Sequence, residues 1–233
     1  MNNSETKGME SYRKYIFGQT ISFHFGETAF AENAAEEIDL YPDSNKNSSD
    51  ITIEIDTQGP EAVALSVNPS LHVETDSGFK ISSGPVDILW DFSKLEPRIV
   101  LSSKVKRSFL ASYPKKFLSM GYVSPHEASG QILHELVLVP LTYFLQDIAP
   151  IHCSAFTRNG KAFLLGGTGG VGKTSALLNL CSTMSIEFLA DDITVVSEEG
   201  FAYPNLAYPK IYAYNTEGNK ALESLLLAKE NWA

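Results

Sequence analysis

The first half of the chain alternates short apolar runs with turn-forming residues. Ile51–Ile55 reads apolar, polar, apolar throughout, and because side chains two positions apart lie on one face of a strand, this run predicts a half-buried strand. Many short strands with little helix favour an antiparallel sheet, and the polar stretch 33–50 predicts a loop. The strands predicted besides 51–55 lie at residues 15–17, 20–25, 62–67, 71–75, 79–82, 87–92 and 98–101.

A longer apolar segment opens the second half. Pro125 predicts the start of a helix that reaches toward Gln146 and ends at Ala149-Pro150. Pro140 predicts a kink in it, because proline lacks the N–H group that a helix interior needs. The apolar residues on most sides of this helix predict that it is buried.

A hairpin and a strand–helix–strand unit follow this helix. Strands are predicted at 151–156 and 161–165 around the turn signal Arg158–Lys161, which contains Asn-Gly, and the second strand reads as buried. The later pattern predicts a helix at 175–180, strands at 186–190, 193–196, 201–203 and 208–212, and a final helix at 221–228. The chain is therefore predicted to be α/β, with an N-terminal β-rich region (1–124) and a second region that contains a helical connector followed by an α/β domain (125–233).

Composition narrows the possible partners. The net charge is −10, which argues against nucleic acid, because nucleic-acid binding needs a basic face, and against an anionic membrane surface. The N-terminus carries no signal-like segment, and no apolar run approaches the ~18–20 residues of a spanning helix. The two cysteines, Cys153 and Cys181, fit neither a disulfide framework nor a zinc site, so a cytoplasmic protein is expected.

The segment Gly167–Thr174 carries the most specific chemistry in the chain. Its sequence GTGGVGKT fits G-x-x-x-x-G-K-[ST], the loop that wraps nucleotide phosphates. Glycines allow positive φ angles, and the successive N–H groups and the following helix N-terminus bind anions. In such a loop Lys173 neutralises phosphate charge and the Thr174 hydroxyl binds Mg²⁺. The alternative is a glycine-rich turn with one exposed lysine.

The surroundings of the loop favour the nucleotide interpretation. A strand precedes it, a helix begins inside it, and the next strand ends in Asp191-Asp192, at the sheet edge where a Mg²⁺ carboxylate belongs. Adjacent strand residues point to opposite faces, so both aspartates reach one site only if the strand has ended there. The alternatives are that the two aspartates cap the strand and that His152 is a core histidine.

His152, the hairpin, the glycine loop and Asp191-Asp192 together resemble the HPr kinase/phosphorylase-like superfamily, which shares its nucleotide site with ATP-dependent phosphoenolpyruvate carboxykinase. The resemblance covers roughly residues 150–200. The N-terminal half is similar, more loosely, to the HPr-kinase-related serine kinases of peptide-modifying gene clusters. This resemblance implies a phosphoenolpyruvate carboxykinase-like P-loop fold. It also implies an ATP- and Mg²⁺-dependent kinase that phosphorylates a hydroxyl, most plausibly Ser of a peptide or protein.

The resemblance also implies a role for each site residue. Lys173 holds the phosphates during transfer, Thr174 and Asp191 bind the metal, and His152 sits beside the transferring group. The residues alone leave open which aspartate is the general base, and the resemblance favours Asp192. The cofactor-binding residues implied are Gly167, Thr168, Gly169, Gly170, Val171, Gly172, Lys173, Thr174 and Ser175.

Some positions depart from the family pattern. Cys153 stands where the HPr-recognising enzymes have glycine, and residues 204–233 lack the family's later acidic block. These departures argue against HPr as the acceptor, and they are expected of either a shortened relative of the family or a fragment. They keep open a nucleotide-binding regulatory module without efficient catalysis. A GTPase-like switch is the least favoured reading, because the chain has no N-K-x-D motif.

Overall fold

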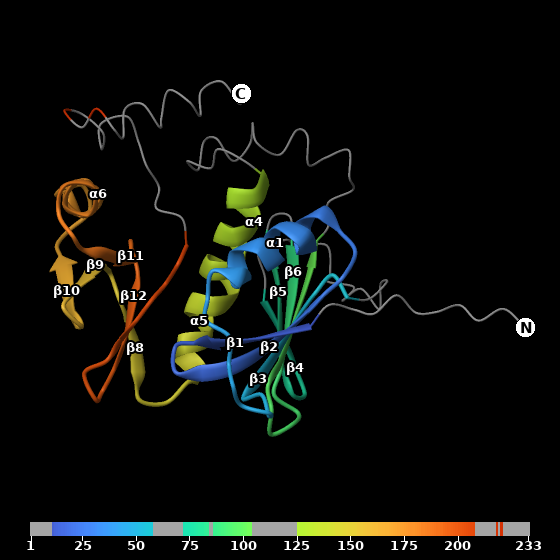
Figure 1. The fold of residues 1–233 in the computed structure, drawn as a ribbon. Coiled ribbons are helices and arrows are strands. Elements are labelled where there is room, and N and C mark those ends of the chain that lie inside the picture. The colour runs from blue at the N-terminus through green and yellow to red at the C-terminus, as the bar shows by residue number, and fades with distance from the viewer. Residues whose placement is uncertain are drawn as a thin grey trace, which may run out of the picture. The chain divides into compact units, whose positions relative to one another are not determined.

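The computed structural model describes residues 11–57, 72–83, 86–103, 125–207, 218 and 220. The chain is a mixed α/β protein that divides into two units, Met1–Leu110 and Ala111–Ala233, each considered by itself below (Figure 1). The strands predicted at 62–67 and 208–212 and the helix predicted at 221–228 lie outside the described residues.

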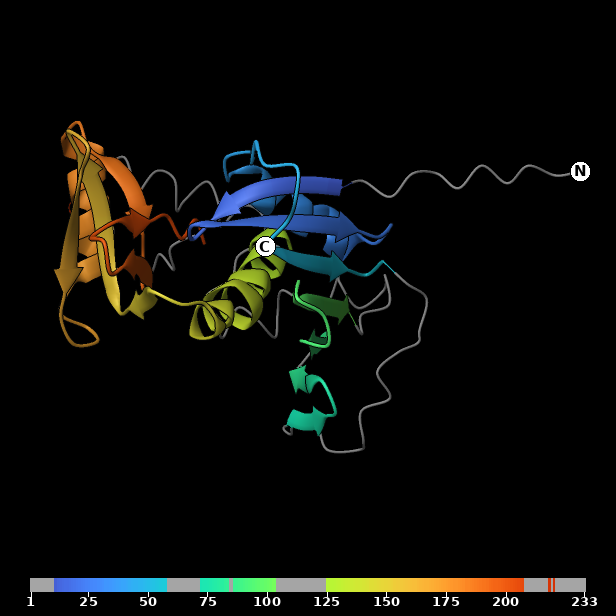
Figure 2. The same cartoon turned by 90° about the horizontal axis from the view of Figure 1, so that it is seen from below.

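The first unit is built on a seven-stranded sheet with the order β1-β2-β3-β7-β6-β5-β4. Figure 2 shows the green β7 beside the blue-teal β3 and the teal β4 at the far edge of the sheet. The predicted strands within the described residues are confirmed, with ends shifted by a few residues. Their bounds are β1 (Ser11–Ile16), β2 (Gln19–Phe25), β3 (Ile51–Ile55), β4 (His72–Thr75), β5 (Gly78–Ser83), β6 (Val86–Asp91) and β7 (Arg98–Ser103).

The predicted antiparallel sheet is wrong in its middle, where β2 pairs with β3 and β3 with β7 in parallel. Helix α1 (Ala29–Asp39) occupies part of the predicted loop 33–50 and accounts for the first of these two parallel pairs. Parallel neighbours need a crossover connection, usually a helix, and α1 provides it between β2 and β3. Thr28 caps α1 by accepting the Ala31 N–H at 3.1 Å.

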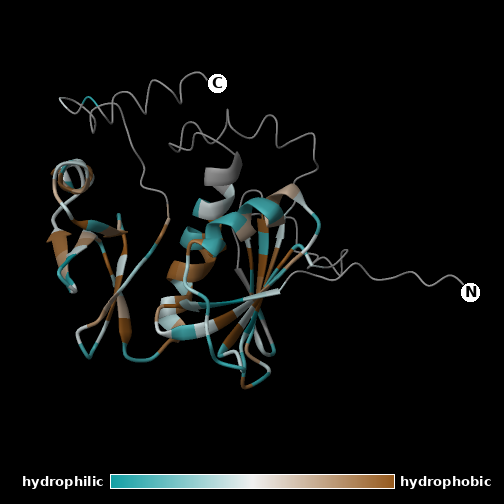
Figure 3. Cartoon of the chain, viewed as in Figure 1, coloured by the Kyte–Doolittle hydropathy of each residue, from teal (hydrophilic) through white to brown (hydrophobic). Residues whose placement is uncertain are grey.

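The core of this unit follows from the strand alternation. The apolar side chains of β3 are buried and its polar ones half-buried, and β6 and β7 repeat the pattern. Figure 3 shows the apolar residues as brown bands along these strands. Trp90 is fully buried and stacks on Phe79, with 5.5 Å between ring centroids. The half-buried face carries an ion pair in which Arg98 binds both carboxylate oxygens of Glu54.

The second unit starts with the predicted helix, which changes geometry before Pro140. Helix α4 (Pro125–Leu133) continues as a π-helical turn (His134–Leu138), then α5 (Val139–Leu141) and a 3₁₀ turn (Thr142–Phe144). The wider turn precedes Pro140, whose ring would clash with the preceding turn of a regular helix. The segment ends at Phe144, earlier than predicted, because Ala149 and Pro150 belong to strand β8.

Two three-stranded sheets complete this unit, with the orders β10-β9-β11 and β13-β12-β8. The predicted strand 151–156 is interrupted, because Ile151 ends β8 and Cys153 starts β9. The strand bounds are β8 (Ile148–Ile151), β9 (Cys153–Arg158), β10 (Lys161–Gly166), β11 (Glu187–Ala190), β12 (Thr194–Ser197) and β13 (Ala202–Tyr203), and helix α6 spans Lys173–Thr183.

The predicted hairpin between β9 and β10 is confirmed. Asn159 and Gly160 both have positive φ, 53° and 71°, as a tight two-residue hairpin turn requires. The predicted burial of the strand after it is wrong, since Phe163 and Leu164 in β10 are 45% and 40% exposed. The reason is position, because β10 is an edge strand of its three-stranded sheet.

Candidate functional site

The glycine loop connects β10 to α6 with a backbone that only glycine adopts easily. Gly170 and Gly172 have φ angles of 79° and 92°, in the left-handed region that costs other residues roughly 1–2 kcal/mol. Gly172 is also the N-cap of α6, so the helix begins at the end of the motif and Lys173 and Thr174 lie in its first turn. Thr168, Gly169 and Val171 are exposed, and Ser175 is half-buried.

Lys173 folds back over the loop that precedes it. Its Nζ donates to the carbonyl oxygens of Gly167 at 3.0 Å and Thr168 at 3.3 Å. The ammonium group is thereby placed beside the loop that the sequence analysis assigned to phosphates. These two carbonyls are its partners in the absence of an anion, and phosphate oxygens are stronger acceptors because they are charged.

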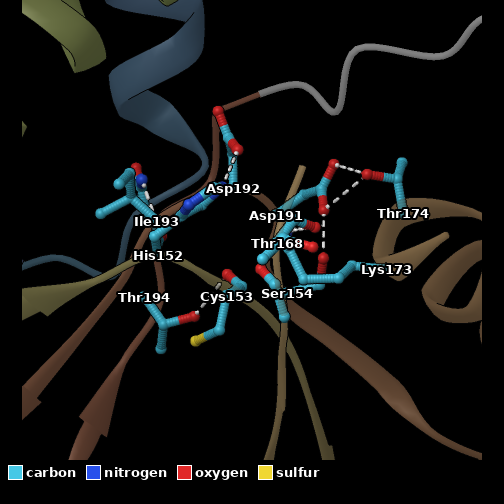
Figure 4. A network of polar contacts seen from close by, with 12 residues as sticks. His152, Cys153, Ser154, Thr168, Lys173, Thr174, Asp191, Asp192, Ile193 and Thr194 are labelled. Atoms are coloured by element: carbon cyan, nitrogen blue, oxygen red, sulfur yellow. Dashed lines mark hydrogen bonds and ion pairs between the residues drawn. The ribbon is translucent and has the colours of Figure 1, made fainter. Parts of the chain in front are cut away.

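Asp191 joins the first turn of α6 to strand β9 (Figure 4). Its carboxylate accepts the Thr174 hydroxyl, at 3.2 Å to Oδ1 and 3.0 Å to Oδ2. It also accepts the Ser154 hydroxyl at 2.5 Å. Asp191 is buried, with 7% of its surface exposed. The predicted proximity of Thr174 and Asp191 is therefore present in the structure.

Asp192 points to a different partner. Its Oδ1 lies 3.0 Å from Nε2 of His152, and the side chains are 66% and 55% exposed. Because an ionised carboxylate only accepts hydrogen bonds, Nε2 carries the hydrogen in this pair. His152 is therefore an exposed residue rather than a core histidine, and the second carboxylate oxygen of Asp192 faces away from this bond (Figure 4).

The two aspartates diverge because the strand ends before them. Strand β11 stops at Ala190, the Ile193 N–H returns to the Asp191 carbonyl at 2.8 Å, and Asp192 has a φ of 68°. Adjacent residues can thus serve one site from opposite sides of a tight turn, as the sequence analysis required. A positive φ at a non-glycine residue stores backbone strain, and such strain concentrates at functional sites.

The chain passes from one three-stranded sheet to the other at two breaks between strands. His152 separates β8 from β9, and residues 191–193 separate β11 from β12. Strand β8 pairs with β12 and β9 pairs with β11, so the two breaks are neighbours. The Thr194 hydroxyl bonds to the Cys153 carbonyl at 3.3 Å and links the residues beside them.

Sequence reasoning missed three contributors to this site: Ser154, Thr194 and Asn205. Ser154 lies within the predicted strand 151–156, and no sequence motif marks it. Asn205 follows β13 and forms hydrogen bonds on both sides of the acidic turn, which comprises residues 191–193. A polar residue in an apolar strand was the one available signal for Ser154, because buried hydroxyls need a partner.

The donors present suit a hard divalent cation. Thr174 Oγ1 and the Asp191 carboxylate are oxygen ligands of the kind Mg²⁺ prefers, and Mg²⁺ fills its remaining positions with waters and phosphate oxygens. Among the residues that the structure describes, no group of three or more His, Cys, Asp or Glu side chains could hold a metal. Among the described residues, the oxygen groups brought together here are the hydroxyls of Thr174 and Ser154 and the Asp191 carboxylate.

A scan of the chain against protein-family models finds no match, and searches of curated proteins and of solved structures find none either. Within the described ranges, none of the helices has the length and apolar character needed to cross a membrane.

Proposed function

We propose that the chain is an ATP- and Mg²⁺-dependent kinase that transfers the γ-phosphoryl group to a hydroxyl, most plausibly serine of a peptide or protein. One observation carries the proposal: the glycine loop, with Lys173 folded over it, opens a helix whose Thr174 hydroxyl binds Asp191, while the adjacent Asp192 binds His152. We propose a phosphoenolpyruvate carboxykinase-like P-loop domain for the second unit and a cytoplasmic location.

The two aspartates differ in how far their side chains are exposed, and this difference gives them different proposed roles. Asp192 is open to solvent and its Oδ1 is engaged by His152, which leaves Oδ2 for an acceptor hydroxyl. In transfer, the serine oxygen bonds to the γ-phosphorus while the bond from that phosphorus to the β,γ-bridging oxygen breaks, and ADP leaves. Asp192 accepts the hydroxyl proton, a role typically worth about 10²–10⁴-fold in rate.

His152 and Lys173 supply positioning and charge. The His152 N–H holds the Asp192 carboxylate and lies beside the place where the phosphoryl group passes. Lys173 exchanges its two loop carbonyls for phosphate oxygens. Phosphoryl transfer depends on such positioning and neutralisation more than on covalent help.

Thr174 and Asp191 would hold the Mg²⁺ ion, whose chemistry is to neutralise phosphate charge. Their mutual hydrogen bonds already bring the two oxygen donors together. Ser154 orients the same carboxylate from strand β9. The buried position of Asp191 fits a residue that contacts the cofactor rather than a protein acceptor.

The first experiment separates binding from transfer. Isothermal titration of the full chain with ATP, with and without Mg²⁺, should show Mg²⁺-dependent binding. Incubation with γ-labelled ATP and a library of serine-containing peptides should transfer the label to peptide. The phosphoserine ester formed should survive acid, whereas a phosphohistidine formed at His152 would not. Binding without peptide labelling would favour the regulatory-module alternative, and an absence of ATP binding would overturn both.

A further inference from the structure

Asn205 lies at the acidic turn although it is distant in sequence and belongs to no predicted motif. It follows β13 and forms an isolated parallel bridge with Ala190, the last residue of β11. It is 3% exposed, so its side chain cannot reach a ligand in solvent. Its contacts are therefore with the protein itself.

Two hydrogen bonds from Asn205 bracket the turn. Its backbone N–H donates to the Leu189 carbonyl at 3.1 Å, before the aspartates. Its side-chain Nδ2 donates to the Ile193 carbonyl at 3.0 Å, after them. One residue therefore fixes the spacing between the two ends of the segment that carries Asp191 and Asp192.

The amide orientation follows from this geometry. The atom facing the Ile193 carbonyl must be the nitrogen, since two oxygens would repel each other. Oδ1 then points elsewhere and is buried without a hydrogen-bond partner among the described residues, which costs about 1–3 kcal/mol. A side chain that bears this cost for one donated bond is better explained by placement of the turn than by stability.

The turn needs such a constraint. Asp192 is held at a φ of 68° and is largely exposed, so packing contributes little to fixing it. Strands β11 and β12 belong to different sheets, so no continuous ladder of hydrogen bonds runs through the turn. The bonds from Asn205 span this interruption from one side, and the Thr194–Cys153 bond spans it from the other.

We infer that Asn205 is the positioning residue that sets the geometry of the Asp191–Asp192 turn, acting through backbone carbonyls rather than by touching substrate. The inference rests on the proposed function for its effect on rate. Its effect on the turn itself is independent of any activity.

The test compares Asn205→Asp and Asn205→Ala with the control Asn179→Ala, which changes an exposed asparagine on α6. Asn205→Asp keeps the side-chain size and replaces the donor with an oxygen. Both variants should lower the rate of peptide labelling at saturating ATP by roughly 10–100-fold, because misplacement of reacting groups by about 1 Å has effects of this size. The dissociation constant for ATP measured without Mg²⁺ should stay within about threefold, because Lys173 and the loop are untouched.

Amide hydrogen exchange supplies the readout that needs no activity. In both variants the Ile193 amide should exchange at least about tenfold faster, while the amides of the β9–β10 hairpin keep their protection. Faster exchange throughout the second unit would reduce Asn205 to a general stability role and overturn the inference. Unchanged Ile193 exchange, or an unchanged rate in a chain whose wild type is active, would also overturn it. A wild type that never labels peptide defeats the proposed function, and the exchange result then decides the inference by itself.

Discussion

Each unit of the molecule contains one aspartate with a left-handed backbone close after a strand, and the two differ in what surrounds them. Asp56 follows β3 with a φ of 50°, and its carboxylate accepts the Ser103 N–H, the Ser103 hydroxyl and the Thr28 hydroxyl at 2.5–2.6 Å. Asp192 has a similar φ, but it is 66% exposed and binds His152. Backbone strain alone therefore does not identify a functional residue. The proposed role of Asp192 rests on its open carboxylate oxygen as well as on its backbone.

Lys14 and Lys173 differ in the same way, one being paired with carboxylates and the other with backbone carbonyls. Lys14 in the first unit is 3% exposed and lies between Asp39 and Asp43, whose hydrogen bonds raise its pKa against the opposing effect of desolvation. Lys173 binds two neutral carbonyls. The first lysine is paired with two carboxylates, whereas the described partners of the second are two uncharged backbone oxygens.

The largest expected effect comes from substituting the two aspartates, Asp192 and Asp56. Asp192→Asn should lower peptide phosphorylation by about 10²–10⁴-fold with ATP affinity unchanged, because the amide cannot accept the hydroxyl proton. Asp56→Ala should leave the rate unchanged in folded protein and lower the free energy of unfolding by about 2–3 kcal/mol, because it strands three donors. Initial rates with γ-labelled ATP and urea unfolding measure the two effects. Full activity in Asp192→Asn would remove it as the base.

The next effect distinguishes the units by their response to acid. Burial lowers the pKa of His134 from 6.5 to about 4, and its Nδ1 donates to the Gly130 carbonyl. The unfolded chain binds this proton more readily, so the second unit should be fully stabilised above pH 6.5. It should lose on the order of 3 kcal/mol as the pH falls to 4.

The first unit should respond at lower pH. The hydrogen bond from Arg98 lowers the pKa of Glu54 from 4.5, so the stability from this pair is present above pH 4.5 and is lost below it. Urea midpoints across this range, followed through amide signals of each unit, should show the second unit weakening first. The variant His134→Gln should flatten its dependence between pH 6.5 and 4. If wild type and His134→Gln give parallel curves, the assignment to His134 is wrong.

The lysine comparison predicts a smaller effect. Lys173→Ala should weaken ATP binding by roughly 10–100-fold, because a charged hydrogen bond to phosphate contributes about 1.5–3 kcal/mol. Lys14→Ala should leave ATP affinity unchanged and lower stability, since it leaves Asp39 and Asp43 unpaired. Isothermal titration and thermal unfolding of both variants provide the measurements. Equal ATP affinity in Lys173→Ala and wild type would contradict the assignment of the loop.

The smallest effect concerns Ser154. Ser154→Ala should raise the Mg²⁺ concentration for half-maximal peptide labelling by about three- to tenfold, because one hydrogen bond orienting Asp191 contributes around 1 kcal/mol. The control is Ser182→Ala, whose hydroxyl bonds to the Asn179 carbonyl on the exposed side of α6. A Mg²⁺ titration of labelling rate compares them, and identical curves would show that Ser154 does not orient Asp191.

Short-range patterns predicted the parts of the fold that short-range physics determines. The Asn159-Gly160 turn, the strand before the glycine loop and the helix after it depend on residues within a few positions. Helix α1 was missed because its apolar stripe, Phe30, Ala34 and Ile38, lies among glutamates in a polar stretch. The parallel pairing of β2 with β3 was missed with it, because the crossover helix is what allows these two strands to lie parallel.

The residues of the candidate site also fall into those that local patterns predicted and those that they could not predict. The motifs predicted Lys173, Thr174, Asp191, Asp192 and His152, because each residue type has a place in nucleotide chemistry. Ser154 and Asn205 could not be predicted, because their roles depend on partners that only the folded chain brings near. Ser154 lies 37 positions from Asp191, and the Asn205 side chain bonds a carbonyl 12 positions away. Neither residue stands in a recognisable local pattern.

The position of His152 and Asp192 at the two crossings between the three-stranded sheets has a mechanical consequence. Each residue connects strands of both sheets, so a change in the angle between the sheets would act directly on the hydrogen bond between imidazole and carboxylate.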